Sequence, residues 1–280
     1  MKRLIALMMT LVMGMACLTG CGDTSTSTSS NGSASGAAVG EDDSLQYVLD
    51  KGTFILGLDD NFPPMGFRDD DNNIVGFDID LAREVCNRLG VELVCQPISW
   101  EAKEQELSSK NIDCIWNAFG LTPEREEALT CSKAYATESS EIVVLKDSSI
   151  QTLDDLKGKK GIVQTGSSVL ENADAKGIVD TFGDLTYVED NVKAMLDLDV
   201  NGSDFVIIDS LIAGYYMKQN EGKYRYLSES LSTDKLGVAF RKGDQKLCDA
   251  VYEKLQEMKK DGKLAEISNK WFGEDITCVE

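Results

Sequence analysis

The chain has 280 residues, of which 42% are hydrophobic and 27% charged, a composition typical of proteins that bury apolar cores and unlike that of disordered chains. Its 28 Lys and Arg residues against 48 Asp and Glu residues give a net charge of −20, which repels nucleic-acid phosphates and anionic membrane surfaces. The sequence has no histidine, which excludes Ser-His-Asp and Cys-His catalysis and HExxH zinc sites, so any chemistry would use carboxylates, Lys, Tyr or Cys.

The N-terminal segment has the pattern of a secretory signal. Two basic residues precede an apolar run at residues 4–18, which has the short length of a signal and not that of a membrane span. The segment Leu18-Thr19-Gly20-Cys21 resembles the bacterial lipobox, which implies removal of residues 1–20 and attachment of lipid, including palmitate, to Cys21. An ordinary cysteine after an ordinary signal is the alternative.

The next segment, residues 21–44, is rich in Ser, Thr, Gly and Ala and too poor in apolar residues to pack, so we expect a flexible tether. Together with the lipobox, it predicts a protein at the extracellular face of the cell membrane that contacts the membrane only through its lipid anchor. No second hydrophobic span follows in the sequence.

Strand and helix patterns alternate along the rest of the chain, which is typical of a mostly parallel sheet covered by helices. Leu81, Val85 and Leu89 recur at i, i+4 and i+8 before Gly90, which predicts a helix that ends there. Strands are predicted at residues 53–58, 91–98, 113–118, 161–164, 185–188, 204–208 and 236–241. Helices are predicted at residues 78–89, 101–109, 167–175, 191–198, 210–217, 244–260 and 263–271.

The elements divide into two α/β lobes. Residues 45–136 form the first part of lobe 1, residues 137–233 form lobe 2, and residues 234–280 are too few for a domain and are expected to return to lobe 1. Sheets of this class bind ligands at the carboxyl ends of their strands, so we expect a ligand cleft between the lobes.

Six cysteines lie in the folded part. No CxxC pair occurs, so the common structural zinc spacing is missing, and we expect neither a metal nor a cofactor. Several lie in apolar stretches, so most are expected to be free core thiols, although the sequence does not specify a pairing. The six are Cys86, Cys95, Cys114, Cys131, Cys248 and Cys278.

The motif Gly76-Phe77-Asp78-Ile79-Asp80-Leu81 resembles the signature of the family-3 extracellular solute-binding proteins of amino-acid ABC importers. Further motifs follow in the family's order: Phe62-Pro63-Pro64-Met65-Gly66-Phe67, Leu121-Thr122-Pro123-Glu124-Arg125, Gln164-Thr165-Gly166-Ser167-Ser168 and Lys270-Trp271-Phe272-Gly273. The resemblance implies a periplasmic-binding-protein-like (type II) fold and a monomer that closes on a free amino acid and delivers it to a membrane permease. The signal, lipobox and tether fit the version used by bacteria without an outer membrane.

The resemblance assigns both ends of an amino acid. Arg125 matches the arginine that pairs with the ligand α-carboxylate, and a guanidinium fork suits a carboxylate. Ser168 and the N–H groups of the Gly166-Ser167-Ser168 turn match a second carboxylate contact, and Asp209 matches the aspartate that takes the α-ammonium. The alternatives are a solvated ion pair of Arg125 with a neighbouring glutamate, and helix capping by the serines and by Asp209.

The side-chain slot is assigned to Asp59, Phe62 and Trp100, whose rings and carboxylate would suit a polar or basic amino acid such as lysine, arginine or glutamine, with cystine left open. Core packing is the alternative for both aromatic residues. The family usually has a hydroxyl residue where this chain has Gly120. This departure leaves carboxylate binding to Arg125, to backbone N–H groups near Ala118 and to lobe 2.

Two other interpretations remain. An enzyme on the same scaffold, such as a dehydratase, would use a cleft carboxylate as general acid, with Glu101 and Asp59 as candidates. The acidic run Asp69-Asp70-Asp71-Asn72-Asn73 has the composition of a calcium loop but lacks the required Gly and distal Glu, so we expect a solvated hairpin turn.

Overall fold

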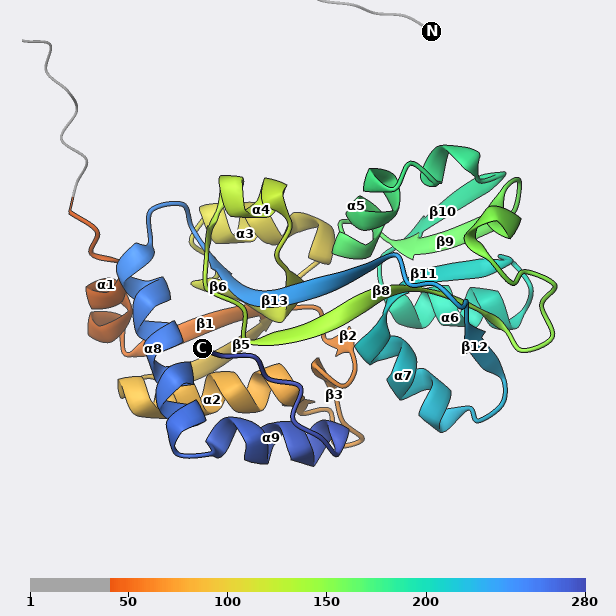
Figure 1. Ribbon diagram of the computed structural model, residues 1–280. Coiled ribbons are helices and arrows are strands. Elements are labelled where there is room, and N and C mark those ends of the chain that lie inside the picture. The colour runs from red at the N-terminus through yellow and green to blue at the C-terminus, as the bar shows by residue number, and fades with distance from the viewer. Residues whose placement is uncertain (1–40) are drawn as a thin grey trace, which may run out of the picture. The chain divides into compact units, whose positions relative to one another are not determined.

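The computed structural model describes residues 41–280, which form one compact unit. The predicted signal, Cys21 and most of the predicted tether lie outside the described residues. Within the described part, one long sheet runs through the molecule in the order β10-β9-β11-β8-β13-β6-β1-β5 (Figure 1).

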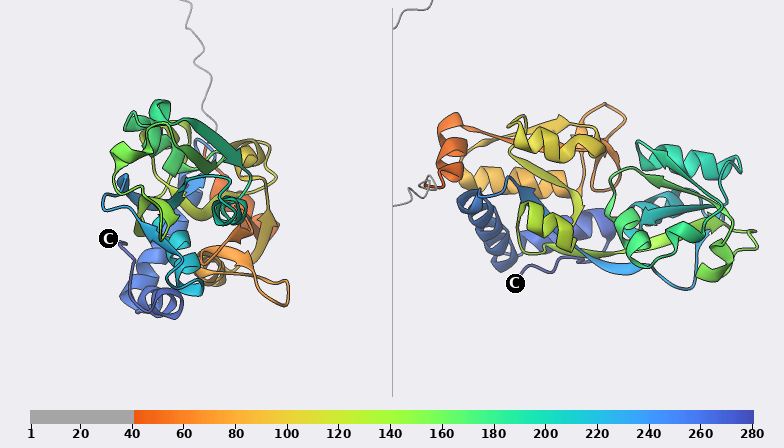
Figure 2. Two further views of the ribbon diagram at one scale, coloured as in Figure 1. Left: turned by 90° about the vertical axis from the view of Figure 1, so that its right-hand side faces the viewer. Right: turned by 90° about the horizontal axis from the view of Figure 1, so that it is seen from above.

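Two long antiparallel strands connect the halves of this sheet. They are β8 (Ala136–Leu145) and β13 (Ser232–Phe240), paired from Ser140 with Ser232 to Ala136 with Leu236. Strand β8 also pairs with strands of one lobe, and β13 with strands of the other, and Figure 2 shows both passing from lobe to lobe. The predicted two-lobed α/β fold is confirmed, and the predicted lobe boundaries fall inside these two strands.

Lobe 1 is built on parallel strands with helices on both faces. Its strands are β1 (Thr53–Leu58), β5 (Glu92–Pro97), β6 (Cys114–Gly120) and the short β7 (Thr130–Cys131). Its helices are α1 (Ser44–Lys51), α2 (Phe77–Leu89), α3 (Lys103–Ser108, after a 3₁₀ turn at Trp100–Ala102), α4 (Pro123–Ala128), α8 (Gln245–Lys260) and α9 (Lys263–Phe272).

Successive side chains of a strand point to opposite faces of the sheet, so one strand packs against the helices on both faces. Along β6, Cys114 and Trp116 pack into the core cluster that contains α2, α8 and α9, whereas Ile115 and Phe119 pack into the cluster beneath α3. Helix α2 ends where predicted, at Gly90, which has a φ of 77°. Because β1 and β6 pair in parallel, their carboxyl ends meet at one edge of the lobe.

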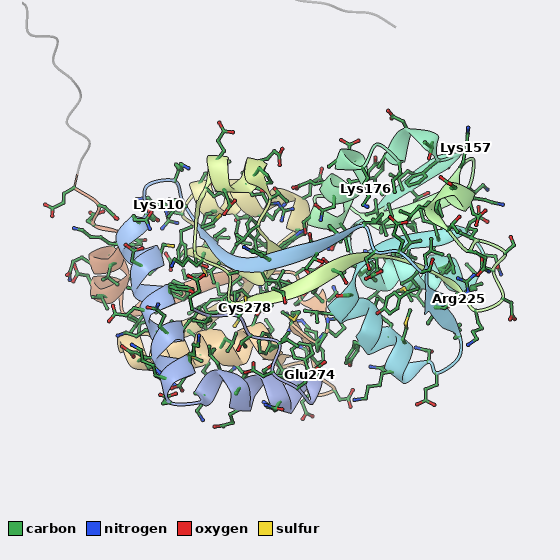
Figure 3. The ribbon with its side chains drawn as sticks, in the orientation of Figure 1. Lys110, Lys157, Lys176, Arg225, Glu274 and Cys278 are labelled. Atoms are coloured by element: carbon green, nitrogen blue, oxygen red, sulfur yellow. The ribbon has the colours of Figure 1, made fainter. Side chains whose placement is uncertain are left out.

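Lobe 2 repeats this plan with three parallel strands. They are β9 (Lys160–Gln164), β10 (Asp184–Val188) and β11 (Phe205–Asp209), and β12 (Tyr224–Tyr226) pairs with β8. Its helices are α5 (Ser168–Ala175), α6 (Asn191–Asp199) and α7 (Ser210–Gln219), with 3₁₀ turns at Leu153–Leu156 and Val179–Thr181. Arg225 of β12 donates to the carbonyls of Ser148 (2.9 Å) and Ile150 (2.5 Å), which holds the loop after β8 (Figure 3).

A small three-stranded sheet lies between β1 and α2. Its strands are β2 (Asn61–Phe62), β3 (Gly66–Arg68) and β4 (Ile74–Val75). The acidic run joins β3 to β4, and the Asp69 carboxylate accepts the N–H groups of Asp71 (3.0 Å) and Asn73 (2.8 Å). The predicted hairpin turn is confirmed.

Candidate functional site

Polar residues gather where the strands of both lobes end. Asp59 follows β1, Gly120 ends β6, Gln164 ends β9 and Asp209 ends β11. The carboxyl ends of parallel strands meet at one edge of a sheet, where α/β proteins bind ligands. Two of the predicted site residues, Asp59 and Asp209, therefore lie toward the junction of the lobes.

Arg125 is held at this junction by a short capped helix. Thr122 caps α4 by accepting the N–H of Arg125 (3.4 Å), and Pro123 occupies the first helical position, where its missing N–H has no cost. Arg125 is only 5% exposed, and its guanidinium lies 4.7 Å from the ring centre of Phe119. The alternative of a solvated surface pair is wrong.

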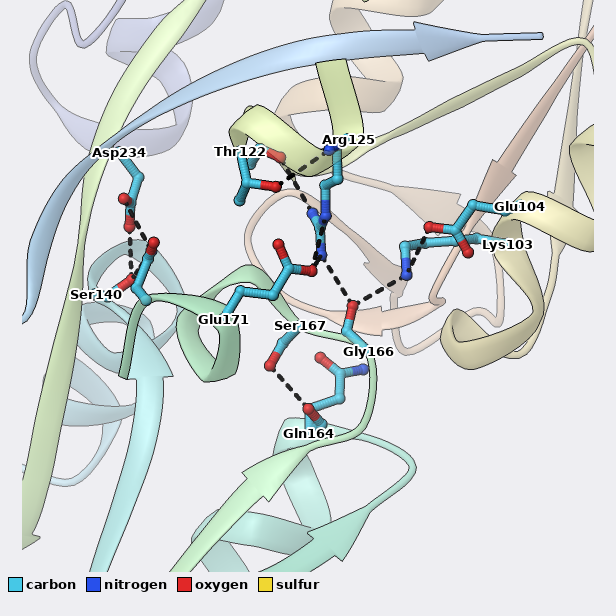
Figure 4. A network of polar contacts seen from close by, with 12 residues as sticks. Lys103, Glu104, Thr122, Arg125, Ser140, Gln164, Gly166, Ser167, Glu171 and Asp234 are labelled. Carbon is cyan, nitrogen blue, oxygen red and sulfur yellow. Dashed lines mark hydrogen bonds and ion pairs between the residues drawn. The ribbon is translucent and has the colours of Figure 1, made fainter. Parts of the chain in front are cut away.

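The guanidinium contacts both lobes (Figure 4). Its Nε and NH2 atoms donate to Oε1 of Glu171 in lobe 2, at 3.1 and 2.9 Å. NH2 also donates to the carbonyl of Gly166 (3.0 Å), and NH1 donates to the carbonyl of Gly120 (3.1 Å). One carboxylate oxygen of Glu171 thus bridges Nε and NH2 of Arg125.

Sequence reasoning missed Lys103, a second buried cation beside Arg125. Its side chain is 3% exposed, and its Nζ donates to the same Gly166 carbonyl at 3.0 Å, over the ring of Trp100 (Figure 4). Burial, with a contribution from Arg125, lowers the pKa of Lys103. The signal was its spacing, because Trp100, Lys103 and Leu107 follow i, i+3, i+7 and place a lysine on an apolar face.

A hydrogen-bonded chain also joins the lobes through Asp59. Gln164 Nε2 donates to Oδ2 of Asp59 (2.7 Å), and Asn191 Nδ2 donates to Oε1 of Gln164 (3.0 Å). Burial raises the pKa of Asp59 to about 6, against the hydrogen bonds from Asn61 and Gln164 that favour its charged form. Asp59 therefore lies in the junction as predicted, in contact with lobe 2.

A cavity of about 120 Å³ opens beside Asp59. It is lined by Asp59, Asp60, Asn61, Ile98, Ser99, Trp100, Glu189, Asp190 and Lys193. Trp100 thus borders the cavity, whereas Phe62 is packed in the main apolar core and is not among the lining residues. A larger groove of about 550 Å³ lies elsewhere, between α7 and α9.

The expectation for Ala118 needs correction. Its N–H donates to Oδ2 of Asp78 (2.7 Å), so in this structure that group is not available to a ligand carboxylate. Ala118 has a φ of 47°, in the left-handed region, and Asp78 also accepts the hydroxyl of Tyr135 (2.8 Å). Burial raises the pKa of Asp78 to about 7. The family-like motif around Asp78 thus fixes the backbone at the end of β6.

The departure at Gly120 has a structural counterpart. A Cβ at position 120 would lie 2.5 Å from Oγ and 2.8 Å from Cβ of Ser168, so the space of the missing side chain is filled by a hydroxyl from the other lobe. Ser167 stands at the N-cap of α5 but makes no capping bond; its Oγ donates to the Gln164 carbonyl (2.8 Å). A side chain at 120 and the observed position of Ser168 exclude one another.

Asp209 is 4% exposed and stands at the N-cap position of α7 without a side-chain capping bond, so the capping alternative does not fit. Its carboxyl group faces that of Glu138 on β8, which sequence reasoning missed. Burial raises the pKa of both groups, to about 6 for Asp209.

Other expectations concern chemistry and membranes. Within residues 41–280 no group of three potential metal ligands has a metal-binding arrangement, and no helix there has the length and apolarity to cross a membrane. Glu101, a candidate acid of the enzyme alternative, is exposed. The six cysteines are free thiols.

Comparison with known proteins identifies the family. Residues 54–274 match the family model of bacterial extracellular solute-binding proteins, family 3. The chain belongs to this family. It is 33% identical over 237 residues to the L-cystine-binding protein TcyJ of Escherichia coli, covering 83% of this chain and 87% of that protein.

Two further relatives differ in ligand. The arginine-binding extracellular protein ArtP of Bacillus subtilis is 31% identical over 225 residues, covering 79% of this chain and 87% of ArtP. The crystal structure of an ABC uptake transporter substrate-binding protein from Streptococcus pneumoniae with bound histidine is 33% identical, with a TM-score of 0.81 and coverage of 85% and 98%. Relatives of this chain are thus amino-acid-binding proteins.

Proposed function

We propose that this chain is the amino-acid-binding component of an ABC importer, a monomer that closes on one free amino acid and passes it to the permease. The observation that carries the proposal is the buried Arg125 fork, which already holds a carboxylate oxygen at 2.9 and 3.1 Å. Buried carboxyl groups, Asp209 among them, supply the complementary site for an ammonium. One cation and one anion at opposite ends match a zwitterion.

Closure follows from where these groups lie. Arg125 belongs to lobe 1, and its partners Glu171 and Gly166 belong to lobe 2. A ligand carboxylate would exchange with Glu171 on the same edge of the guanidinium, so the ligand would replace one inter-lobe contact by another. Only the form in which both lobes approach each other offers every contact, so the ligand shifts the population toward it.

The walls of the cavity favour a polar or basic side chain. Four acidic residues line it, and its one lining cation, Lys193, is paired with Glu189 (2.6 Å) and Asp190 (2.9 Å). A cationic or amide-bearing side chain would meet carboxylates there and the face of Trp100. Arginine, lysine, histidine, glutamine and cystine are therefore the first ligands to test.

A melting-temperature screen with the common amino acids and cystine tests the proposal. A ligand present at 100 times its Kd stabilises the native state by about 2.7 kcal/mol, which gives a clear shift. We expect a shift with a polar or basic amino acid and recovery of that amino acid unchanged after incubation. No shift with any amino acid would refute the binding role, and conversion of the ligand would support an enzyme.

We also propose that Cys21 carries the lipid that anchors the protein to the extracellular face of the membrane. The signal-like segment and the lipobox-like motif support this proposal. Metabolic labelling with a palmitate analogue should label the wild-type protein in the membrane fraction. Cys21→Ala should abolish the label, and a labelled Cys21→Ala variant would contradict the anchor.

A further inference from the structure

Glu138 is a buried carboxylate without a hydrogen-bond partner. Its side chain is 6% exposed, and both of its oxygens are buried and accept no hydrogen bond. An ionised carboxylate in this position is costly unless a proton or a cation reaches it.

The sheet register places Glu138 beside two other acids. On β8, Glu138 and Ser140 share a face because they are two residues apart. Asp209 of β11 lies opposite Ser140, and Asp234 of β13 lies opposite Glu138, so all three carboxyl groups share that face. The two lobe-connecting strands, β8 and β13, and strand β11 of lobe 2 thus each contribute one carboxyl group to an acidic cluster.

Within this cluster Asp234 is satisfied and Glu138 is not. Asp234 accepts hydrogen bonds from Ser140 Oγ (2.5 Å), Asn172 Nδ2 (3.0 Å) and Ser232 Oγ (3.0 Å). Glu138 instead faces Asp209, another acceptor, so a hydrogen bond between them forms only when one of them carries a proton.

The buried position of Glu138 and the charges around it favour its protonated form. Burial and then Asp209 raise its pKa well above the usual value, and Asp234 on β13 and Asp78 on α2 add to the effect. Arg125 acts in the opposite direction on Asp209. An arriving ammonium has three N–H donors, enough to satisfy both carboxylates at once.

We propose that Glu138 completes, with Asp209, a two-carboxylate receptor for the ligand's ammonium group, and that the ammonium displaces a proton shared by the pair. This inference rests on the proposed amino-acid-binding function. Before binding, the two carboxyl groups share one proton. When the ammonium binds, both carboxylates are ionised and bound to it, and the one proton leaves to solvent. Ligand affinity therefore rises with pH until the pair is ionised without ligand.

Calorimetric titration with L-arginine, L-histidine and L-cystine tests the inference. Comparing phosphate and Tris buffers, whose ionisation heats differ, gives the number of protons released. We expect about one proton per bound ligand near pH 6, and fewer at higher pH as the pair loses its proton. Binding of a probe by the wild-type protein without proton release between pH 5.5 and 8 would overturn the inference.

Glu138→Gln keeps the shape but removes one acidic proton of the pair, so we expect proton release at pH 7.5, above the pKa of about 6 of Asp209, to disappear and affinity to fall at least about tenfold. The matched control is Glu141→Gln, on the same strand but on its other face, where Ser139 (2.6 Å) and Ser230 (2.7 Å) already satisfy the carboxylate. It should keep both proton release and affinity.

Three outcomes are distinct. Binding with proton release that is lost in Glu138→Gln supports the inference. Binding that Glu138→Gln leaves unchanged in affinity and proton count overturns the inference and leaves the binding role standing. No binding of any amino acid to the wild-type protein overturns both.

Discussion

Removing the guanidinium of Arg125 is the sharpest test of the cleft. Arg125→Ala deletes the donors to Glu171, Gly120 and Gly166 and any bond to a ligand carboxylate. Breaking a buried charge pair costs about 3–5 kcal/mol, so we expect ligand affinity to fall by at least about 3 kcal/mol, roughly 150-fold. Calorimetry with the amino acid that gives the largest melting shift measures this loss.

Two variants separate charge from geometry and from general effects of arginine removal. Arg125→Lys keeps the charge but loses the fork, so its affinity should lie between those of the wild type and Arg125→Ala. Arg83→Ala removes an exposed partner of Asp80 (3.0 Å) on α2 and should leave affinity unchanged. An Arg125→Ala variant that folds and binds within threefold of the wild type would refute the assignment of Arg125 to the ligand carboxylate.

Three further predictions concern other parts of the molecule. Gly120→Ala places a Cβ 2.5 Å from Ser168 Oγ, so affinity should fall several-fold, and Ser168→Gly in the same chain should partly restore it; equal affinities throughout would contradict the contact. The raised pKa of Asp59, about 6, favours folding at low pH, and this contribution is lost as pH rises through 6. Thermal melts should therefore show Asp59→Asn gaining stability relative to the wild type from pH 4 to 7, and a relative loss would argue against it. Burial raises the pKa of Cys114 well above its usual value, so in mass spectrometry of iodoacetamide-treated native protein Cys278 should be alkylated before Cys114, and the reverse order would contradict the packing.

Periodicity alone was sufficient for most regular elements. Helix α2 has apolar residues at helical spacing and a glycine at its end, and the structure forms it at Phe77–Leu89 with Gly90 left-handed. Strand β6, predicted at residues 113–118, forms at Cys114–Gly120 and is buried along its whole length, and its sequence is apolar except at Asn117. Such elements are specified by the same local pattern that buries them.

The connecting strand β8 could not be predicted in this way. Its first half, from Ala136 to Ser140, is polar and resembles a loop, yet it is a strand because β13 pairs with it along that length and β11 pairs with it from Ser140 onward. Two of its polar residues, Glu138 and Ser140, face the acidic cluster, where Ser140 donates to Asp234. The strand could not be predicted because polar side chains that belong to the candidate site replace the apolar alternation expected of a buried strand.

Buried charged residues are the part of the site that could be predicted from the sequence least well. Arg125 and Asp209 were found through family motifs, whereas Lys103 lies on a helix whose other buried residue is Leu107, and Glu138 lies on a strand that also buries Glu141. Local pattern cannot show that a charge on such a face has a partner from another lobe. That information exists only once β9, β11 and β8 meet the ends of β1 and β6.

The contacts across the junction also bear on reversibility. Gly166 accepts from both Arg125 and Lys103, and Glu171 accepts from Arg125, so lobe 2 supplies partners to both cations of lobe 1 in addition to Gly120 and Glu104. A ligand carboxylate that replaces Glu171 gains a buried charge-assisted bond, and loss of the bond to Glu171, whose side chain is 38% exposed, offsets only part of that gain. The free energy of binding is then smaller than the full strength of the new Arg125 bond, which keeps release to a permease within reach of a modest change in lobe spacing.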